Sequence, residues 1–175
     1  ELDNGSGTGV KVRAFEPQEF PSGVSDMNGK KGWYIDLVNP PFTAAQKIGE
    51  RIVGTPVVRG TTVLVSSIIP SEDACTIEGS GYVNAVDALT GSSGLYGSES
   101  YFDVNGGGFD NDKLVSTIDG REISIGSIDL GIKMPTDALV LAGDTNELVV
   151  VGGSIGGTGS APFRGTRAVG RISWH

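Results

Sequence analysis

Residues 79–91, GSGYVNAVDALTG, are the most informative part of the sequence for the fold. Their side chains alternate with the period of two that a β-strand requires, so that one face carries Val83 and Ala85. The opposite face carries Tyr82, Asn84, Val86 and Ala88. The alternation ends at Asp87 and Gly91, which are turn-forming residue types. The stretch therefore predicts a strand that closes in a tight turn.

Several other segments have the composition of strands, and we expect an all-β chain. Residues 61–69 are almost continuously apolar, as in a strand covered on both faces, and they predict a hairpin with residues 52–58. Residues 33–38, WYIDLV, combine aromatic and β-branched side chains. Helical periodicity is essentially absent, and residues 43–51 suffice for about one helical turn. The expected strands cover residues 10–15, 33–38, 52–58, 61–69, 81–88, 132–141, 147–153 and 168–174.

A weak internal repeat divides the chain. Residues 52–66 and 132–153 each contain an entry with a proline, an apolar strand, a turn and a valine-rich strand. The copies lie about 80 residues apart, whereas compact propeller blades repeat every 40–50 residues or so. We attribute the difference to an insertion at residues 92–125. The predicted organisation is an irregular segment over residues 1–30, followed by repeated sheet units over residues 31–175.

The composition argues against several classes of partner. With 13 Lys and Arg against 21 Asp and Glu, the 175-residue chain carries a net charge of −8, which disfavours binding to nucleic acid or to an anionic membrane. No apolar run approaches the roughly 18 residues that a membrane helix needs, so we expect no membrane insertion. The 28 glycines indicate many tight turns and short strands. The chain begins at Glu1, and we expect a processed product or a fragment.

The chain has one cysteine, Cys75, and one histidine, His175. Cys75 is compatible with a small buried side chain or with a disulfide partner elsewhere in a longer chain. A Cys–His nucleophile, a zinc site and a Ser–His–Asp triad are disfavoured by this composition, and we expect no catalytic site. The glycine-rich residues 152–159 are expected to form an inter-strand loop, because no strand–helix context for a phosphate cradle surrounds them. Trp33 and Trp174 are expected in the core or at a junction between sheets.

Residues 103–112, DVNGGGFDND, are the clearest candidate for a binding site. Ca²⁺ takes six to eight oxygen ligands, and alternating Asp and Asn side chains in a glycine-permitted turn supply them. Two residues fit the start of a D-x-[DN]-x-[DN]-G loop, but Gly107 stands where the third oxygen side chain is expected. Two later carboxylates could close a shortened loop. The candidate calcium ligands are Asp103, Asn105, Asp110 and Asp112. The alternative is a polar turn whose Asp and Asn side chains bond to their own backbone.

The stretch at residues 79–91 also resembles the outer-edge signature of a β-propeller blade, above all in quinoprotein-like propellers. The resemblance rests on Gly81, Val83, Ala85 and the closing DALTG of residues 87–91. One hypothesis is therefore a fragment of a quinoprotein-like dehydrogenase that binds pyrroloquinoline quinone. Such an enzyme needs a vicinal pair of cysteines, which the single Cys75 rules out within this chain.

Motifs in a fixed order give a closer resemblance to the C-terminal region of PilY-type proteins, the tip adhesins and biogenesis factors of type IV pili. Each motif is weak alone, and their order makes the match specific. The resemblance runs from about residue 30 to residue 175. Its motifs are GWYIDL at 32–37, ERIVGTPVVRG at 50–60, IIPSEDAC at 68–75, GSG at 79–81, DALTG at 87–91, FDVNG at 102–106 and GRISW at 170–174.

This resemblance implies a modified β-propeller, of which the chain would be the last two or three blades. It implies a non-enzymatic adhesin and assembly factor at the pilus tip or outer membrane surface, which supports pilus biogenesis and surface attachment. The implied partners are the remainder of its own propeller, minor pilins and a host or abiotic surface. Some relatives carry a calcium loop reading D-x-N-G-D-G, from which Gly107 departs. Because two or three blades would leave sheet edges open, we expect the remainder of the protein to complete the ring.

Overall fold

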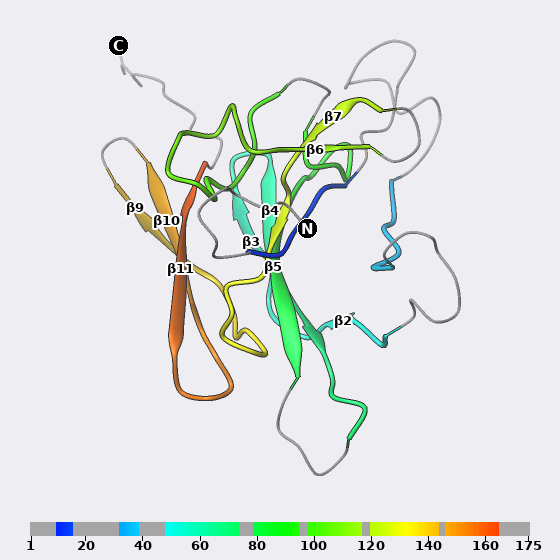
Figure 1. Ribbon diagram of the computed structural model, residues 1–175, viewed down its shortest axis with the longest axis vertical. Helices are drawn as coiled ribbons and strands as arrows, with labels where there is room; N and C mark the ends of the chain where they lie inside the picture. Colours follow the sequence, from blue (N-terminus) through cyan, green and yellow to red (C-terminus); the bar gives the residue numbers. More distant parts are fainter. Residues whose placement is uncertain are drawn as a thin grey trace, which may run out of the picture.

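The structure is a computed structural model that describes residues 10–15, 32–38, 48–73, 79–94, 98–116, 120–143 and 146–164 (Figure 1). Within these ranges the chain forms strands, turns and loops and no helix, which confirms the all-β prediction. The strands are β1 (Val12–Arg13), β2 (Arg51–Ile52), β3 (Val57–Arg59), β4 (Thr62–Ile69), β5 (Ser80–Asp87), β6 (Lys113–Val115), β7 (Glu122–Ser124), β8 (Ser127–Ile128), β9 (Leu139–Ala142), β10 (Glu147–Gly152) and β11 (Thr158–Phe163).

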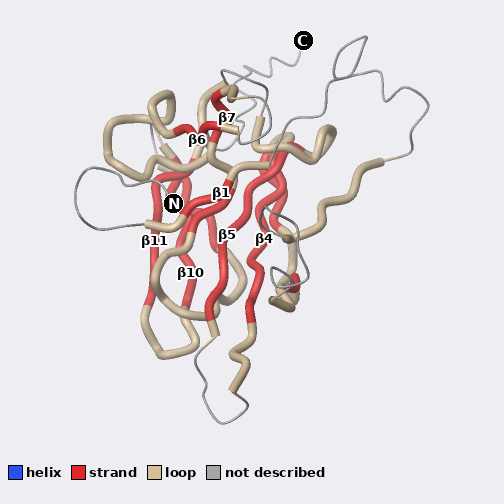
Figure 2. The backbone as a smooth tube through the Cα atoms, turned by 45° about the vertical axis from the view of Figure 1, so that its right-hand side comes forward, coloured by secondary structure: helices blue, strands red, loops and turns tan. Residues whose placement is uncertain are grey.

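The larger sheet has the strand order β1-β8-β5-β4-β2, and β3 also pairs with β4. Its centre is the antiparallel pair of β4 and β5, in which every residue has a partner from Thr62↔Asp87 to Ile69↔Ser80. The predicted hairpin is present as β3 and β4, with Arg59 opposite Thr62. The chain between β5 and β8 carries the β6–β7 hairpin, which lies at one end of the two larger sheets in both views (Figures 1 and 2).

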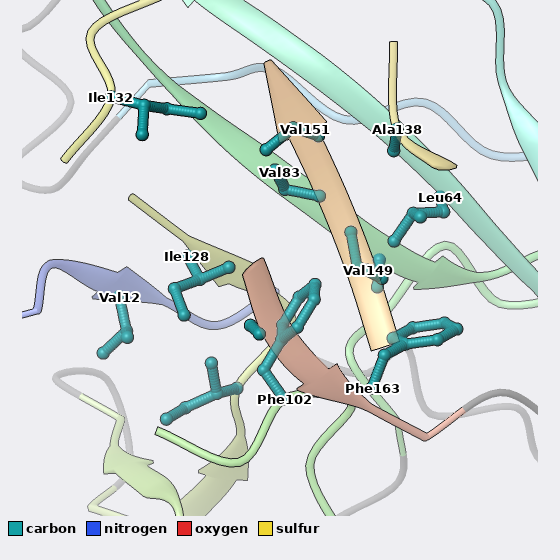
Figure 3. Close-up of a cluster of buried hydrophobic side chains, with 13 residues drawn as sticks. Val12, Leu64, Val83, Phe102, Ile128, Ile132, Ala138, Val149, Val151 and Phe163 are labelled. Atoms are coloured by element: carbon teal, nitrogen blue, oxygen red, sulfur yellow. The ribbon is translucent and has the colours of Figure 1, made fainter. Parts of the chain in front are cut away.

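The second sheet is the antiparallel meander β11-β10-β9, and it packs face to face on the first. Alternation within each strand decides which side chains enter the shared core. Figure 3 shows Leu64 and Val83 of the first sheet across from Val149 and Val151 of β10. Phe163 of β11 closes one end of this core. Burying each such side chain stabilises the fold by about 1.5–3 kcal/mol, so the apolar face of β10 is a main reason why the two sheets stay together.

The strand predicted over residues 81–88 is confirmed, and so is the turn that ends it. Val83 and Ala85 are buried in the core, whereas Asn84 lies on the opposite face of the sheet. Asp87 ends the strand because its Oδ1 accepts hydrogen bonds from two backbone N–H groups of the turn, both at 2.9 Å. Gly91 has a φ of +70°, a conformation that favours glycine.

The prediction of a strand at residues 33–38 is wrong, because residues 32–38 form no regular secondary structure. Trp33 lies against the turn after β5, where its indole N–H donates to the carbonyl of Ala88 at 2.8 Å and its ring covers Gly91. Tyr34 is 86% exposed. The aromatic side chain therefore docks on a neighbouring turn, and the backbone pairs with no strand. Trp33 is at the surface, although we expected it in the core or at a sheet junction.

The two halves of the predicted repeat form similar hairpins, β3–β4 and β9–β10, and each hairpin is extended by a third antiparallel strand. Both sheets are open, and this arrangement does not by itself show a propeller. Only Val12–Arg13 of the strand expected at residues 10–15 is paired. Some expectations lie outside the described residues: those for Cys75, residues 168–174, Trp174 and His175.

Candidate metal-binding loop

The loop of residues 103–112 is attached to the second sheet at its beginning. It follows Phe102, which is fully buried and forms a β-bridge with Phe163 of β11. The two rings lie 5.7 Å apart between centroids. The N–H of Asp103 donates to the carbonyl of Pro162 at 3.3 Å, and the N–H of Arg164 donates to the carbonyl of Tyr101 at 2.9 Å. The first candidate ligand is therefore held next to the core between the sheets.

The far end of the loop is held by Ser100. Its N–H donates to the carbonyl of Phe109 at 2.7 Å, and its hydroxyl donates to the carbonyl of Asp112. The same hydroxyl accepts the N–H of Ile125 at 2.7 Å. Because one buried serine bonds to both the loop and the chain leading to β8, the two ends of the loop have fixed positions.

Asp103 and Asn105 bond to the backbone of their own loop. Asp103 Oδ1 accepts the N–H of Gly106 at 2.7 Å, and Oδ2 accepts the N–H of Gly108 at 3.2 Å. Asn105 Oδ1 accepts the N–H of Gly107 at 2.6 Å. These contacts are those of the polar turn that the sequence left open as an alternative.

Asp112 is the buried member of the candidate set, with only 3% of the residue exposed. Burial raises the pKa of its carboxyl, and the hydrogen bond that its Oδ2 accepts from the N–H of Val104 at 3.0 Å opposes this effect. Asp103, through its charge and a side-chain contact, and the charge of Asp110 raise the pKa further. The structure therefore brings three carboxylates close enough to oppose the ionisation of one of them.

Asn105 lies on the exposed side of the loop, beside a residue that the sequence analysis did not select. Asn105 Nδ2 donates to Asn111 Oδ1 at 3.4 Å. A Cβ at Gly107 would lie 2.8 Å from Asn105 Oδ1 and closer still to the amide of Asn111, so a larger residue there would displace these two exposed side chains. Asn111 belongs to the same run of Asp and Asn residues, and this pattern could have identified it as a further candidate from the sequence. Among the described residues, no group of three or more His, Cys, Asp and Glu side chains is arranged to hold a metal ion.

A buried ion pair, which the sequence analysis missed, lies on the other face of the larger sheet. Arg13 donates from both terminal nitrogens to Glu50, at 2.7 and 2.6 Å, and its guanidinium lies 3.6 Å from the ring centroid of Tyr82. The side chain of Glu50 is 1% exposed. Ser67 donates to Glu50 at 2.5 Å and accepts a hydrogen bond from Asn84 at 2.9 Å. The network joins β1, β4 and β5 to residue 50, so it holds distant segments of the chain on one sheet.

A second ion pair connects the two sheets. Arg59 at the end of β3 pairs with Glu147 at the start of β10, and Glu147 is buried. The hydrogen bond and charge of Glu147 raise the pKa of Arg59. Because a carboxylate buried without a cation costs several kcal/mol, this pair favours one alignment of the sheets.

A shallow cavity of about 360 Å³ lies beside the open end of the β4–β5 pair. Its lining includes Lys11, Pro70, Asp129 and Lys133 and none of the residues of the 103–112 loop. The candidate metal-binding residues and this cavity are therefore separate features.

Comparison with known proteins gives two relatives. No family model and no solved structure matches the chain significantly. The chain is 29% identical over 174 residues to a protein of Xylella fastidiosa strain Temecula1 named "Type IV pilus biogenesis factor PilY1 homolog". A second protein of the same name and organism is 34% identical over 67 residues, which are 38% of this chain and 4% of that protein.

The first alignment covers 99% of this chain and 12% of the relative, so the chain spans a small part of the length of the protein it matches. The similarity confirms the expected resemblance and supports a PilY1-type region. In the part of the chain that the structure describes, no helix is long and apolar enough to cross a membrane.

Proposed function

We propose that this chain is a structural region of a type IV pilus biogenesis factor, with a non-enzymatic role in assembly and surface attachment. The observation that carries the proposal is the similarity to a protein named as such a factor over 99% of the chain. The proposed location is the outer membrane surface or the pilus tip. The proposed partners are minor pilins, a host or abiotic surface and the remainder of a longer polypeptide.

The two sheets are proposed to be successive blades of a modified propeller. Three features support this: the two similar meanders, their face-to-face packing, and the outer face of the second sheet. That face exposes Leu139, Leu141 and Leu148, with Leu139 59% exposed. Another sheet seated there would remove this apolar surface from water. Hydroxyl-radical footprinting should find these leucines protected in the longer protein and reactive in this chain alone; equal reactivity in both would contradict the arrangement.

The biogenesis proposal is tested in the source bacterium by changing only this region of the longer gene. Deletion of the region, and Phe163→Ala in the core between the sheets, should reduce the number of surface pili seen by electron microscopy. Val115→Ala, at a side chain 65% exposed, is the matched control and should leave piliation normal. Normal pili with lost attachment would limit the role to adhesion, and normal piliation and attachment after deletion would contradict both roles.

Calcium binding by the 103–112 loop is a further part of the proposal. Its support is that Asp103 and Asp110 contribute to the raised pKa of Asp112, an effect that a bound divalent cation would oppose. A ligand at 100 times its dissociation constant stabilises a fold by about 2.7 kcal/mol, so saturating calcium should raise the melting temperature. Asp103→Asn should abolish the rise, and Asp129→Asn, in another turn, should retain it. No rise in the unaltered chain would contradict the site.

The alternative of a quinoprotein-like dehydrogenase fragment has a direct test. Pyrroloquinoline quinone is added to the purified protein, and its absorbance spectrum is followed during titration. A saturable spectral change would favour the dehydrogenase and contradict the scaffold role proposed for this region.

A further inference from the structure

Asn105 and Gly106 form an exposed Asn-Gly pair within the 103–112 loop. Asn-Gly is the dipeptide in which an asparagine side chain most readily reacts with the following backbone nitrogen, because glycine has no Cβ to obstruct ring closure. Nothing lies within 4 Å of the position that a Cβ on Gly106 would occupy. We propose that Asn105 is a site of self-promoted deamidation, in which the loop itself supplies the groups that assist the reaction.

The attacking atom is the backbone nitrogen of Gly106. Its N–H donates to Asp103 Oδ1 at 2.7 Å. A carboxylate in this position accepts the proton as the nitrogen attacks, which is the role of a general base. Asp103 is itself fixed by its second oxygen, which accepts the N–H of Gly108, and by its own N–H on β11.

The atom under attack is the side-chain carbon of Asn105. Its Oδ1 accepts the N–H of Gly107 at 2.6 Å. This bond polarises the amide and stabilises the negative charge that develops on Oδ1 in the tetrahedral intermediate, as an oxyanion hole does. The leaving nitrogen, Nδ2, is on the exposed side, where its contact to Asn111 at 3.4 Å is weak and water can protonate it.

The reaction balances without an oxidant or a cofactor. The Gly106 nitrogen forms a bond to Asn105 Cγ and gives its proton to the carboxylate of Asp103. The bond from Cγ to Nδ2 breaks, ammonia leaves with a proton taken from water, and Asp103 returns its proton to the hydroxide that remains. Water then adds to one carbonyl of the five-membered succinimide, which opens to aspartate or to isoaspartate at position 105.

The product adds a fourth acidic group to a loop that contains Asp103, Asp110 and Asp112. Whether this added carboxylate strengthens cation binding depends on the calcium site proposed above. The modification itself does not, because it is measured without metal. Failure of the calcium titration and failure of the deamidation assay are therefore separate results.

The test incubates the full chain at neutral pH in chelator, folded or in denaturant, and locates the NH₂-to-OH mass gain by tandem mass spectrometry. In denaturant, Asn4, Asn28 and Asn105 all precede glycine and report the rate of the dipeptide alone. We expect Asn105 to react at least tenfold faster in the folded chain than in denaturant, since positioned acid–base groups contribute about 10²–10⁴-fold. Folded Asn111 and Asn146, exposed but followed by acidic residues, should stay unmodified. An equal or slower folded rate at Asn105 overturns the proposal.

A pair of variants tests whether Asp103 acts as the general base. Asp103→Asn should slow the folded reaction by about 100-fold, the lower end of the range for a general base. The matched control is Asp129→Asn, because Asp129 Oδ1 likewise accepts a backbone N–H of its own turn, that of Gly131 at 2.8 Å. The control should change the rate by less than about twofold. Equal rates in the two variants would overturn the role of Asp103, and circular dichroism of both variants shows whether the fold is retained.

Discussion

The outer faces of the two meanders differ, although their inner faces share one core. Behind β5, Asn84 and Ser67 join the Arg13–Glu50 ion pair, and Glu50 is almost fully buried. Behind β10, Leu148 and its neighbours on β9 are exposed. One sheet is therefore covered on both faces and the other on one. The same strand pattern can form either a central or an outer layer, depending on which segments of the chain return to cover it.

The largest expected effect comes from breaking the core that both meanders share. Phe163→Ala removes a fully buried ring that packs on Phe102 and should cost about 3–5 kcal/mol of unfolding free energy. Denaturant unfolding followed by circular dichroism measures the loss. A cost of about 0.5 kcal/mol or less, as expected for an exposed site such as Val115, would contradict the shared core.

Removing the ion pair behind β5 should have the next largest effect. Glu50→Ala leaves Arg13 on the sheet without its carboxylate and should cost about 3 kcal/mol. The double variant Arg13→Met with Glu50→Leu should recover most of this loss, because no buried charge remains. If the double variant were as unstable as the sum of the single ones, the ion pair would not be the unit that holds this face together.

Two neighbouring residues of β10 test whether the outer face of the second sheet is exposed. Val149 is fully buried toward the core, whereas Leu148 points to the outer face with 37% exposure. Val149→Ala should cost about 2 kcal/mol and Leu148→Ala less than about 1 kcal/mol in this chain. The same unfolding assay compares them. A larger loss at Leu148 would mean that the outer face is covered.

The smallest expected effect concerns the loop between the sheets. The raised pKa of Asp112 means that the folded chain favours its protonated form, so this group stabilises the fold at low pH and the contribution is lost as pH rises through the raised pKa. Asp112→Asn in chelator should therefore raise the melting temperature at neutral pH, and the gain should shrink as pH falls. A gain independent of pH would contradict the role of the carboxyl charge.

Local patterns predicted the parts of this molecule whose neighbours are close in sequence. The β3–β4 and β9–β10 hairpins follow from apolar runs separated by short turns. The segment around Trp33 has a strand-like composition too, but its backbone pairs with no strand. The indole of Trp33 packs instead on the turn at Gly91. In the candidate site, the spacing of Asp and Asn residues identified the loop. It did not reveal that Asp112 would be buried and Asn105 exposed, because those positions depend on Phe102, Ser100 and β11.

The β3–β4 and β9–β10 hairpins, the alternation that sends Val83 and Ala85 to one side, and the turn that Asp87 closes follow from the sequence alone, since they depend on side chains a few residues apart. Its motifs also determined the resemblance to PilY-type proteins. The tertiary structure was needed to show that Arg13 meets Glu50, that Phe102 meets Phe163, and that the N–H of Asp103 bonds to Pro162 of another sheet. These contacts join residues many positions apart, so each forms only where the folded sheets bring distant segments of the chain together.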